Sequence, residues 1–207
     1  RRAAGRIYVS LFGEISAGKS SLIRALLPNA EAEVSVRGGT TREVKEHHWR
    51  SPAGDELVLV DVPGTNEVGV GLDRLAREEA QRSHLVLYVC DGDLTRSQWR
   101  ELDGLLELDK PSILALNKSD RYSAEELGQL MERIGLRLRE SGAERVELVA
   151  IQAGGTQEVL RVLPDGREEL VLRERKPQVE ALKRQLQRCI DRDAEALENL
   201  RDSAVFV

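Results

Sequence analysis

The residues with the clearest chemical meaning form a glycine-rich turn near the amino terminus. A short β-branched and aromatic run, Ile7 to Phe12, leads into Gly13-Glu14-Ile15-Ser16-Ala17-Gly18-Lys19-Ser20-Ser21, and a helical pattern starts at once. Glycines let successive backbone N–H groups turn inward around a β-phosphate, and the helix start adds its positive end. The Lys19 ammonium would reach the β and γ oxygens, and the Ser20 hydroxyl would ligate Mg²⁺. We therefore predict a phosphate-binding loop rather than a purely structural glycine turn.

A second motif follows a buried apolar run. Leu57 to Val60 leads into Asp61-Val62-Pro63-Gly64, so that a carboxylate at a strand end is followed three residues later by a glycine. Asp61 would hold a magnesium-bound water, and the backbone N–H of Gly64 would sense the γ-phosphate. An aspartate in this position is often only a helix cap or a turn residue, and the motif gains its meaning from its place after the phosphate loop.

The segment Arg37-Gly38-Gly39-Thr40-Thr41-Arg42 lies between these two motifs. A threonine hydroxyl here would supply a further protein ligand to Mg²⁺, and we choose Thr41 over Thr40. The alternative is that both threonines merely begin the next strand. The expected metal ligands are therefore Ser20, Thr41 and Asp61, and the expected catalytic residues are Lys19, Thr41 and Gly64.

The quartet Asn117-Lys118-Ser119-Asp120 follows the apolar run Ser112 to Leu116 and bears on the choice of base. Asp120 would accept hydrogen bonds from the N1 and exocyclic amino hydrogens of guanine, a paired donor edge that adenine lacks. Asn117 would brace the loop, and the Lys118 stem would lie over the base. An ordinary polar turn is the alternative, but open sheets bind ligands at carboxyl strand ends such as this one.

The elements that must position these motifs alternate along the chain. Strand patterns at Ile7 to Phe12, Leu57 to Val62, Leu85 to Cys90, Ser112 to Leu116 and Val146 to Ile151 are separated by helical ones, and the last is expected to be central. Val44 to Arg50 and Leu57 to Val62 form a predicted hairpin. Repeated strand–helix units imply parallel strands with right-handed crossovers. The expected fold is a doubly wound, mostly parallel α/β sheet with helices on both faces.

Two additions to this fold are expected near the carboxyl end. A β-hairpin appendage is predicted over residues 157–175, around the turn Pro164-Asp165-Gly166-Arg167. Apolar residues at three- or four-residue spacing, or nearly twice that, then predict a long helix over residues 178–203. Residues 1–207 are expected to form a single domain excised from a longer protein, because the chain opens on Arg1 and its only methionine is Met131.

In this order and spacing, GEISAGKSSL, GGTTR, DVPG and NKSD resemble the G domain of P-loop GTPases, over Ile7 to Val207. GGTTR resembles the Era and TrmE branch of the translation-factor-related class, while SAGKSS is similar to dynamin-like loops. The resemblance implies GTP or GDP as ligand, Mg²⁺ as cofactor and a switch function. It also places Gln152-Ala153 where related domains carry Ser-Ala, with the Ala153 backbone N–H facing the base oxygen.

Two departures from the family pattern concern the rate of hydrolysis. Ras-like domains carry a glutamine after the DxxG glycine to orient water, whereas this chain has Thr65 there, so slow intrinsic hydrolysis is expected. Potassium-stimulated relatives place asparagine where this chain has Ser16, so K⁺ stimulation through Ser16 is a hypothesis. Arg37 is more simply interpreted as a solvated loop residue than as an arginine finger that the chain supplies to its own active site. An activating protein or a homodimer across the nucleotide would supply what Thr65 does not.

Composition narrows the remaining classes. The 207 residues carry 31 basic and 36 acidic side chains, a formal net charge of −5, and only 3% of them are aromatic, which disfavours bulk nucleic-acid binding. The longest apolar run, Leu85 to Cys90, is too short to cross a bilayer. Cys90 and Cys189 read as buried thiols in a reducing compartment, so a cytoplasmic location is expected, with membrane association only through segments outside this chain.

Three functions follow from these observations. The first is a magnesium-dependent GTP-hydrolysing switch. The second is a nucleotide-gated docking or membrane-associated module that binds GTP and hardly hydrolyses it, which the missing glutamine and the hairpin permit. The third, an ATP-dependent small-molecule kinase, shares only the phosphate loop and is disfavoured by Asn117 to Asp120.

Overall fold

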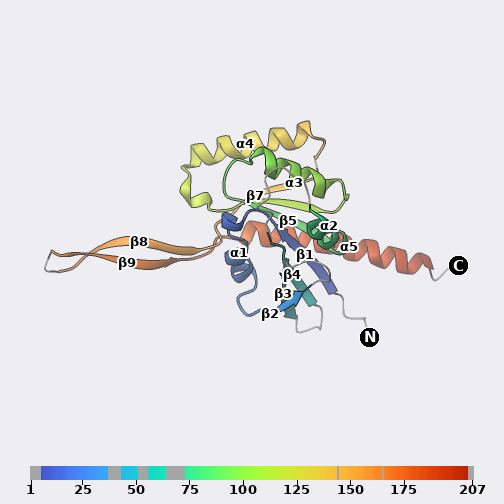
Figure 1. The fold of residues 1–207 in the computed structure, drawn as a ribbon, viewed down its shortest axis with the longest axis horizontal. Helices are drawn as coiled ribbons and strands as arrows, with labels where there is room; N and C mark the ends of the chain where they lie inside the picture. The colour runs from blue at the N-terminus through green and yellow to red at the C-terminus, as the bar shows by residue number, and fades with distance from the viewer. Residues whose placement is uncertain are drawn as a thin grey trace.

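The computed structural model describes residues 6–36, 43–50, 56–63, 73–143, 145–164 and 166–204. Its main sheet has seven strands in the order β2-β3-β4-β1-β5-β6-β7 (Figure 1). The strands are β1 (Arg6–Phe12), β2 (Glu31–Val36), β3 (Glu43–Arg50), β4 (Glu56–Asp61), β5 (Leu85–Cys90), β6 (Ser112–Leu116) and β7 (Glu147–Ala150).

Five of these strands are parallel, and they confirm the predicted fold class. β4, β1, β5, β6 and β7 run in one direction, whereas β2 pairs antiparallel with β3 and β3 antiparallel with β4. The predicted hairpin is thus β3 and β4, joined in register from Lys45 opposite Asp61 to Arg50 opposite Glu56. The prediction of a central place for the strand Val146 to Ile151 is wrong: among the described strands, β7 pairs with β6 alone and is an edge strand.

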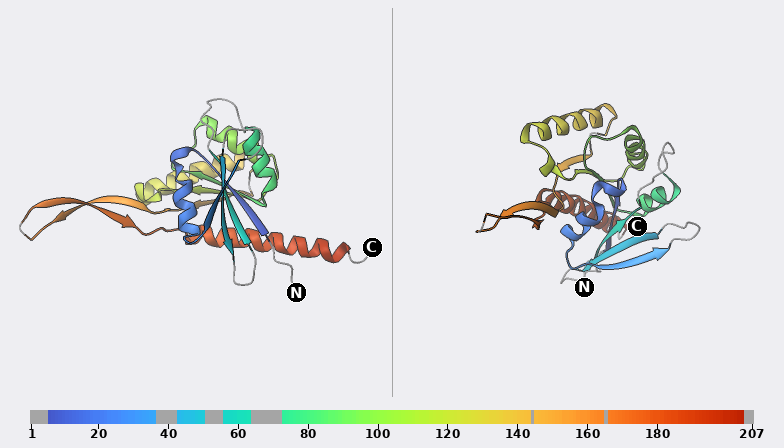
Figure 2. Two further views of the ribbon diagram at one scale, coloured as in Figure 1. Left: turned by 60° about the horizontal axis from the view of Figure 1, so that its bottom comes forward. Right: turned by 60° about the vertical axis from the view of Figure 1, so that its left-hand side comes forward.

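The helices cover both faces of the sheet (Figures 1 and 2). Alternate residues of a strand point to opposite faces, so Leu11 and Leu87 belong to one apolar cluster while Phe12 and Tyr88 belong to the other. One cluster is completed by α1 and α5, and the other by α2, α3 and α4. The helices are α1 (Lys19–Leu26), α2 (Arg74–Arg82), α3 (Arg96–Leu106), α4 (Ala124–Glu140) and α5 (Glu180–Ala204).

The central strands owe their position to continuous apolar sequence. Every residue of β5 and of β6 is buried, which is typical of parallel strands covered on both faces. Local signals fix where the covering helices begin. Ser123 accepts a hydrogen bond from the Glu126 backbone N–H, and the Glu126 side chain accepts one from the Ser123 N–H, so α4 begins with a capping box.

A two-stranded hairpin extends away from this body, as Figure 1 shows on the left. It consists of β8 (Gly155–Val162) and β9 (Glu168–Arg175), which pair antiparallel with each other. Along one face, apolar side chains lie in solvent, at Leu160, Val162, Leu170 and Leu172. The chain then enters α5. Among the described residues, no helix is both long enough and apolar enough to cross a membrane.

One buried polar pair joins β5 to α3. The Tyr88 hydroxyl donates to Glu101 Oε2 over 2.8 Å, and both residues are buried. Burial raises the pKa of the Glu101 carboxyl, while the Tyr88 hydrogen bond and the charge of Lys19 act in the opposite direction. This interior carboxyl therefore lies close enough to the phosphate loop to influence it electrostatically.

The variant Glu101→Gln tests the cost of this buried charge, because it keeps an oxygen acceptor for Tyr88. A raised pKa means that the folded protein keeps the Glu101 proton to higher pH than the unfolded chain, so this group's contribution to stability falls as pH rises above the ordinary value of 4.5. We expect the variant to gain stability relative to the parent between pH 4 and pH 7, by about 1.4 kcal/mol for every tenfold by which folding weakens the acidity of the Glu101 carboxyl.

Urea unfolding at the two pH values measures this effect. Glu132→Gln is the matched control, since Glu132 is exposed on α4. An equal gain in unfolding free energy for both variants would show that burying the Glu101 carboxyl destabilises the fold no more than an exposed carboxylate does.

Candidate functional site

The predicted motifs lie together at the carboxyl ends of the parallel strands, which all end on the same side of the sheet. Gly13 follows β1, Asp61 ends β4, Asp91 follows β5, Asn117 follows β6 and Gln152 lies just beyond β7. Backbone hydrogen bonds hold the strand ends together: the Asn117 N–H donates to the Cys90 carbonyl over 2.7 Å, and the Ile151 N–H donates to the Leu116 carbonyl over 2.8 Å. A ligand binding here is contacted by several loops at once.

Two glycines are required by the shape of the phosphate loop. Gly13 has φ +124°, and a Cβ at this position would come within 2.0 Å of the Val89 carbonyl oxygen. Gly18 has φ +95°, and its Cβ would come within 2.3 Å of Asn117 Nδ2. Neither a left-handed backbone nor such close approach suits an L side chain. Between them Glu14, Ile15 and Ser16 are exposed, whereas Ala17 is buried.

Lys19, at the start of α1, has its ammonium turned back onto the loop. Its Nζ donates to the Gly13 carbonyl over 2.6 Å and to the Glu14 carbonyl over 3.1 Å, and the residue is only 6% exposed. Burial lowers the pKa of Lys19, and the negative charges of Asp61, Glu101 and Glu14 oppose this change. An arriving anion would compensate the buried charge, as a phosphate would.

Ser20 and Asp61 provide oxygen donors next to the loop. The Ser20 hydroxyl donates to Asp61 Oδ2 over 3.3 Å, so a hydroxyl and a carboxylate from α1 and β4 converge. Such a pair of oxygens fits Mg²⁺, which usually takes few protein oxygens and completes its shell with phosphate and water. Ser21 follows on the helix and is half-buried. Thr41 and Gly64, with Arg37 and Thr65, lie outside the described residues.

Asn117 joins the phosphate loop to the loop after β7. Its Nδ2 donates to the Ala17 carbonyl over 2.8 Å, and its Oδ1 accepts the Ala153 backbone N–H over 2.9 Å. Asn117 is 2% exposed, and both partner residues are also buried. The expected bracing role is thus visible as two hydrogen bonds from one amide. The Ala153 N–H, expected to face the base, donates to this amide instead.

Lys118 braces the site in a way that the sequence did not indicate. Its Nζ donates to the Ser16 carbonyl and to Asp91 Oδ2, both over 2.6 Å, and its backbone is left-handed with φ 58°. The Tyr122 hydroxyl in turn donates to the Asp91 carbonyl over 3.0 Å. Sequence reasoning missed Asp91 as a site residue, although it follows a buried parallel strand in the same way as Asn117.

Asp120 lies in a short 3₁₀ turn, Ser119–Arg121, and forms an ion pair with Arg175, the last residue of β9. The carboxylate that is predicted to read the base therefore contacts the root of the hairpin. Gln152 is buried, and its backbone exchanges two hydrogen bonds with that of Gln178, over 3.1 and 2.7 Å. The hairpin therefore starts and ends beside the predicted guanine loop.

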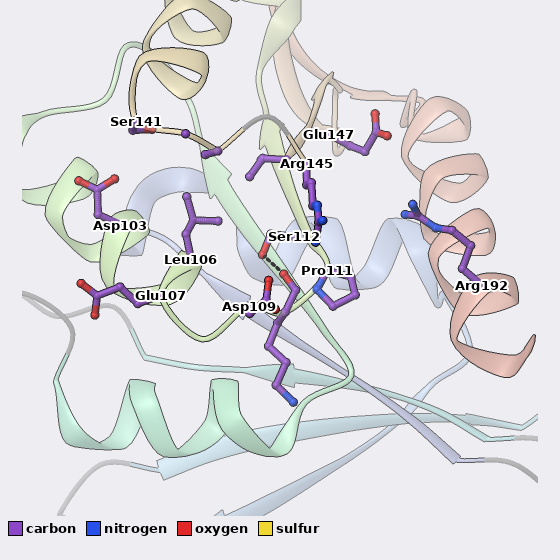
Figure 3. Close-up of a pocket in the computed structure, with 14 residues that line it drawn as sticks. Asp103, Leu106, Glu107, Asp109, Pro111, Ser112, Ser141, Arg145, Glu147 and Arg192 are labelled. Carbon is purple, nitrogen blue, oxygen red and sulfur yellow. Dashed lines mark hydrogen bonds between the residues drawn. The ribbon is translucent and has the colours of Figure 1, made fainter. Parts of the chain in front are cut away.

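A separate polar pocket lies at the opposite edge of the sheet (Figure 3). Its lining includes Pro111 and Ser112 at the start of β6, Glu147 at the start of β7, and Asp103 and Arg145. The Ser112 hydroxyl donates to the Lys110 carbonyl over 2.9 Å. None of the predicted site residues lines this pocket, so we place the candidate site at the carboxyl edge.

Asn117→Ala tests whether one amide holds the two loops. The variant leaves the Ala153 N–H and the Ala17 carbonyl, both in buried residues, without this partner, and each such group costs about 1–3 kcal/mol. We expect a loss of stability of that order in urea unfolding, together with weaker nucleotide binding. Asn29→Ala, at an exposed asparagine, is the control and is expected to change stability by less than about 0.5 kcal/mol. Equal stability of the two variants would contradict the bracing role.

Comparison with known proteins agrees with this geometry. Residues 8–118 match the model of a family described as 50S ribosome-binding GTPase. GTPase Der of Nautilia profundicola is 33% identical over 120 residues, which cover 55% of this chain and 26% of that protein. GTPase Era of Caldanaerobacter subterraneus subsp. tengcongensis is 29% identical over 170 residues, which cover 77% of this chain and 56% of that protein. The chain thus spans about half or less of these relatives.

A solved structure reports on the fold. The G domain of the FeoB iron transporter of T. maritima superposes with a TM-score of 0.58 at 23% identity, over 89% of this chain and 99% of that one. The similarity extends over nearly the whole of both chains and supports the fold alone. The family match covers more than half of the sequence. The chain therefore belongs to this family of P-loop GTPases and is a GTP-binding G domain distantly related to Era and Der.

Proposed function

We propose that this domain is a magnesium-dependent switch that hydrolyses GTP to GDP and phosphate. The observation that carries the proposal is the Asn117 amide, which bonds to both the phosphate loop and the loop after β7. The groups that would grip the triphosphate are thereby held at a fixed position relative to Asp120. A nucleotide that satisfies both ends must carry a phosphate tail and a base with a paired donor edge.

The phosphate end depends on charge and on backbone N–H groups. Lys19 would leave the Gly13 and Glu14 carbonyls and place its ammonium on the β and γ oxygens, supported by loop N–H groups and the start of α1. Ser20 and Asp61, with Thr41, would hold Mg²⁺, which supplies charge neutralisation on the phosphate oxygens when bound. Thr41 and Gly64 would respond to the γ-phosphate, and its loss would release them.

The base end depends on Asp120. Its carboxylate would accept the guanine N1 and amino hydrogens, and Lys118, held by Ser16 and Asp91, would keep the loop against the phosphate loop. Adenine offers no such edge and would leave a desolvated carboxylate unpaired. GTP is therefore the expected substrate, with ATP a poor competitor.

Lys19→Ala tests the phosphate end. The substitution removes a buried, charge-assisted contact to the β and γ oxygens, so GTP should bind about a hundredfold more weakly or worse in titrations with Mg²⁺. Lys110→Ala is the control, because it removes the same charge at the other edge of the sheet, just before β6. Parent-like GTP affinity in Lys19→Ala would refute the assignment of the phosphate loop.

Hydrolysis without a partner is expected to be slow, because Thr65 stands where Ras-like domains carry a water-orienting glutamine. Single-turnover phosphate release should proceed on the order of 10⁻³ s⁻¹ or slower. The same measurement in K⁺ and in Na⁺ tests the hypothesis that Ser16 ligates a monovalent cation. A rate near that of partner-activated domains, about 1 s⁻¹ or faster, would show that the isolated chain already contains a complete catalytic set.

A nucleotide-gated docking module is the second candidate function. The observation that favours it is the line of exposed apolar side chains on the hairpin, which an isolated enzyme would not need. GTP binding of parent strength with no phosphate release, either in K⁺ or with added partners, would favour docking over catalysis.

A further inference from the structure

The ion pair between Arg175 and Asp120 connects the hairpin to the base-reading carboxylate. Arg175 is the last residue of β9, and its Nη1 contacts Asp120 Oδ2. The two side chains are 33% and 24% exposed, so the contact is partly shielded from solvent. It joins residues that are far apart in sequence, which means that the fold itself brings the guanidinium to this acceptor.

The chemistry of the two possible partners of Asp120 is closely similar. The guanine edge that Asp120 is expected to read consists of N1–H, C2 and the amino group on C2, which is a guanidine fragment set in a ring. The arginine side chain ends in the same planar arrangement of N–H donors around one carbon, and this fork matches a carboxylate. Arg175 and guanine therefore offer the same kind of donor to the same carboxylate, which Arg175 contacts at Oδ2.

The backbone keeps Arg175 within reach of the site. Arg175 is the register partner of Gly155, which begins β8 immediately after the predicted guanine loop. Beyond the hairpin, the paired backbones of Gln152 and Gln178 close its base. The backbones of Gly154 and Arg175 also lie close together, since a Cβ on Gly154 would come within 3.2 Å of the Arg175 carbonyl oxygen. A donor tethered in this way acts at high effective concentration.

We propose that Arg175 is a built-in competitor of the guanine base, and that nucleotide binding must displace its guanidinium from Asp120. The inference rests on the proposed guanine-reading role of Asp120. The hairpin thereby lowers the affinity for guanine nucleotides and speeds their release. Any change that draws β9 away from Asp120 tightens binding, so the position of the hairpin sets the affinity of the pocket.

The test uses Arg175→Ala in the full 207-residue chain. Removing the competitor should tighten GDP binding about three- to tenfold in titrations and slow the release of a fluorescent GDP in a chase by a similar factor. Arg173→Ala is the matched control, because Arg173 is an exposed arginine on the same strand. It removes the same charge from the hairpin and should leave both values unchanged.

Two further measurements separate competition from a general structural effect. Inosine diphosphate lacks the amino group on C2 and makes one fewer bond to Asp120, so it should bind more weakly than GDP. Arg175→Ala should nevertheless tighten the binding of both nucleotides by the same factor, because both must displace the same guanidinium, whereas a change in the ratio of their affinities would indicate that Arg175 orients Asp120 instead. In an Asp120→Ala background, Arg175→Ala should change the GDP affinity by no more than the Arg173→Ala control does. Urea unfolding of each variant checks that the fold is retained.

Each other outcome has a distinct meaning. Weaker GDP binding in Arg175→Ala would overturn the proposal and show that the arginine orients Asp120 for the base. Values equal to those of Arg173→Ala would reduce the contact to a surface ion pair and also overturn it. If the parent chain took up no guanine nucleotide at millimolar concentration, the proposed function itself would fall, whatever the Arg175 variants did.

Discussion

The arrangement of the site depends on one buried amide. Asn117 uses its donor for the Ala17 carbonyl in the phosphate loop and its acceptor for the Ala153 N–H beyond β7. Loops that follow different strands would otherwise keep their own conformational freedom, and ordering each residue costs about 1–2 kcal/mol. Because the amide is enclosed, water cannot replace either bond without cost. The spacing between the phosphate loop and the loop after β7 is therefore a property of the folded chain.

The buried charged groups around the phosphate loop lower the stability of the fold and favour the binding of an anion. Lys19 is held in a position where desolvation opposes its charge, while nearby carboxylates and backbone carbonyls compensate it. Glu101 is one of these carboxylates and is itself disfavoured in its charged form by burial. A protein selected only for stability would replace both with apolar residues of similar size. The interaction of these two buried charges beside the phosphate loop is the pattern expected of a site prepared for a multiply charged ligand.

The sequence predicted what is local and missed what is brought together by the fold. The phosphate loop and the buried strands β5 and β6 each depend on neighbouring residues, and each is present in the structure. β2 was not predicted, because its residues gain a partner only through pairing with β3. The place of β7 at the edge depends on strand order, which hydrophobic pattern alone does not determine. The Lys118 bond to Asp91 and the Arg175 contact with Asp120 likewise join segments that no local pattern relates.

The hairpin of β8 and β9 also has a consequence for how such a chain can vary. Its strands pair with each other, and their register is fixed where Gly155 meets Arg175. Deleting or inserting one cross-strand pair of residues at the tip of the hairpin would change the hairpin's length by about 3.4 Å and leave its base beside the nucleotide site unchanged. An unmatched single residue would instead reverse which side chains face each way. The length of the hairpin can thus change in steps of one residue pair without altering the geometry of the nucleotide site.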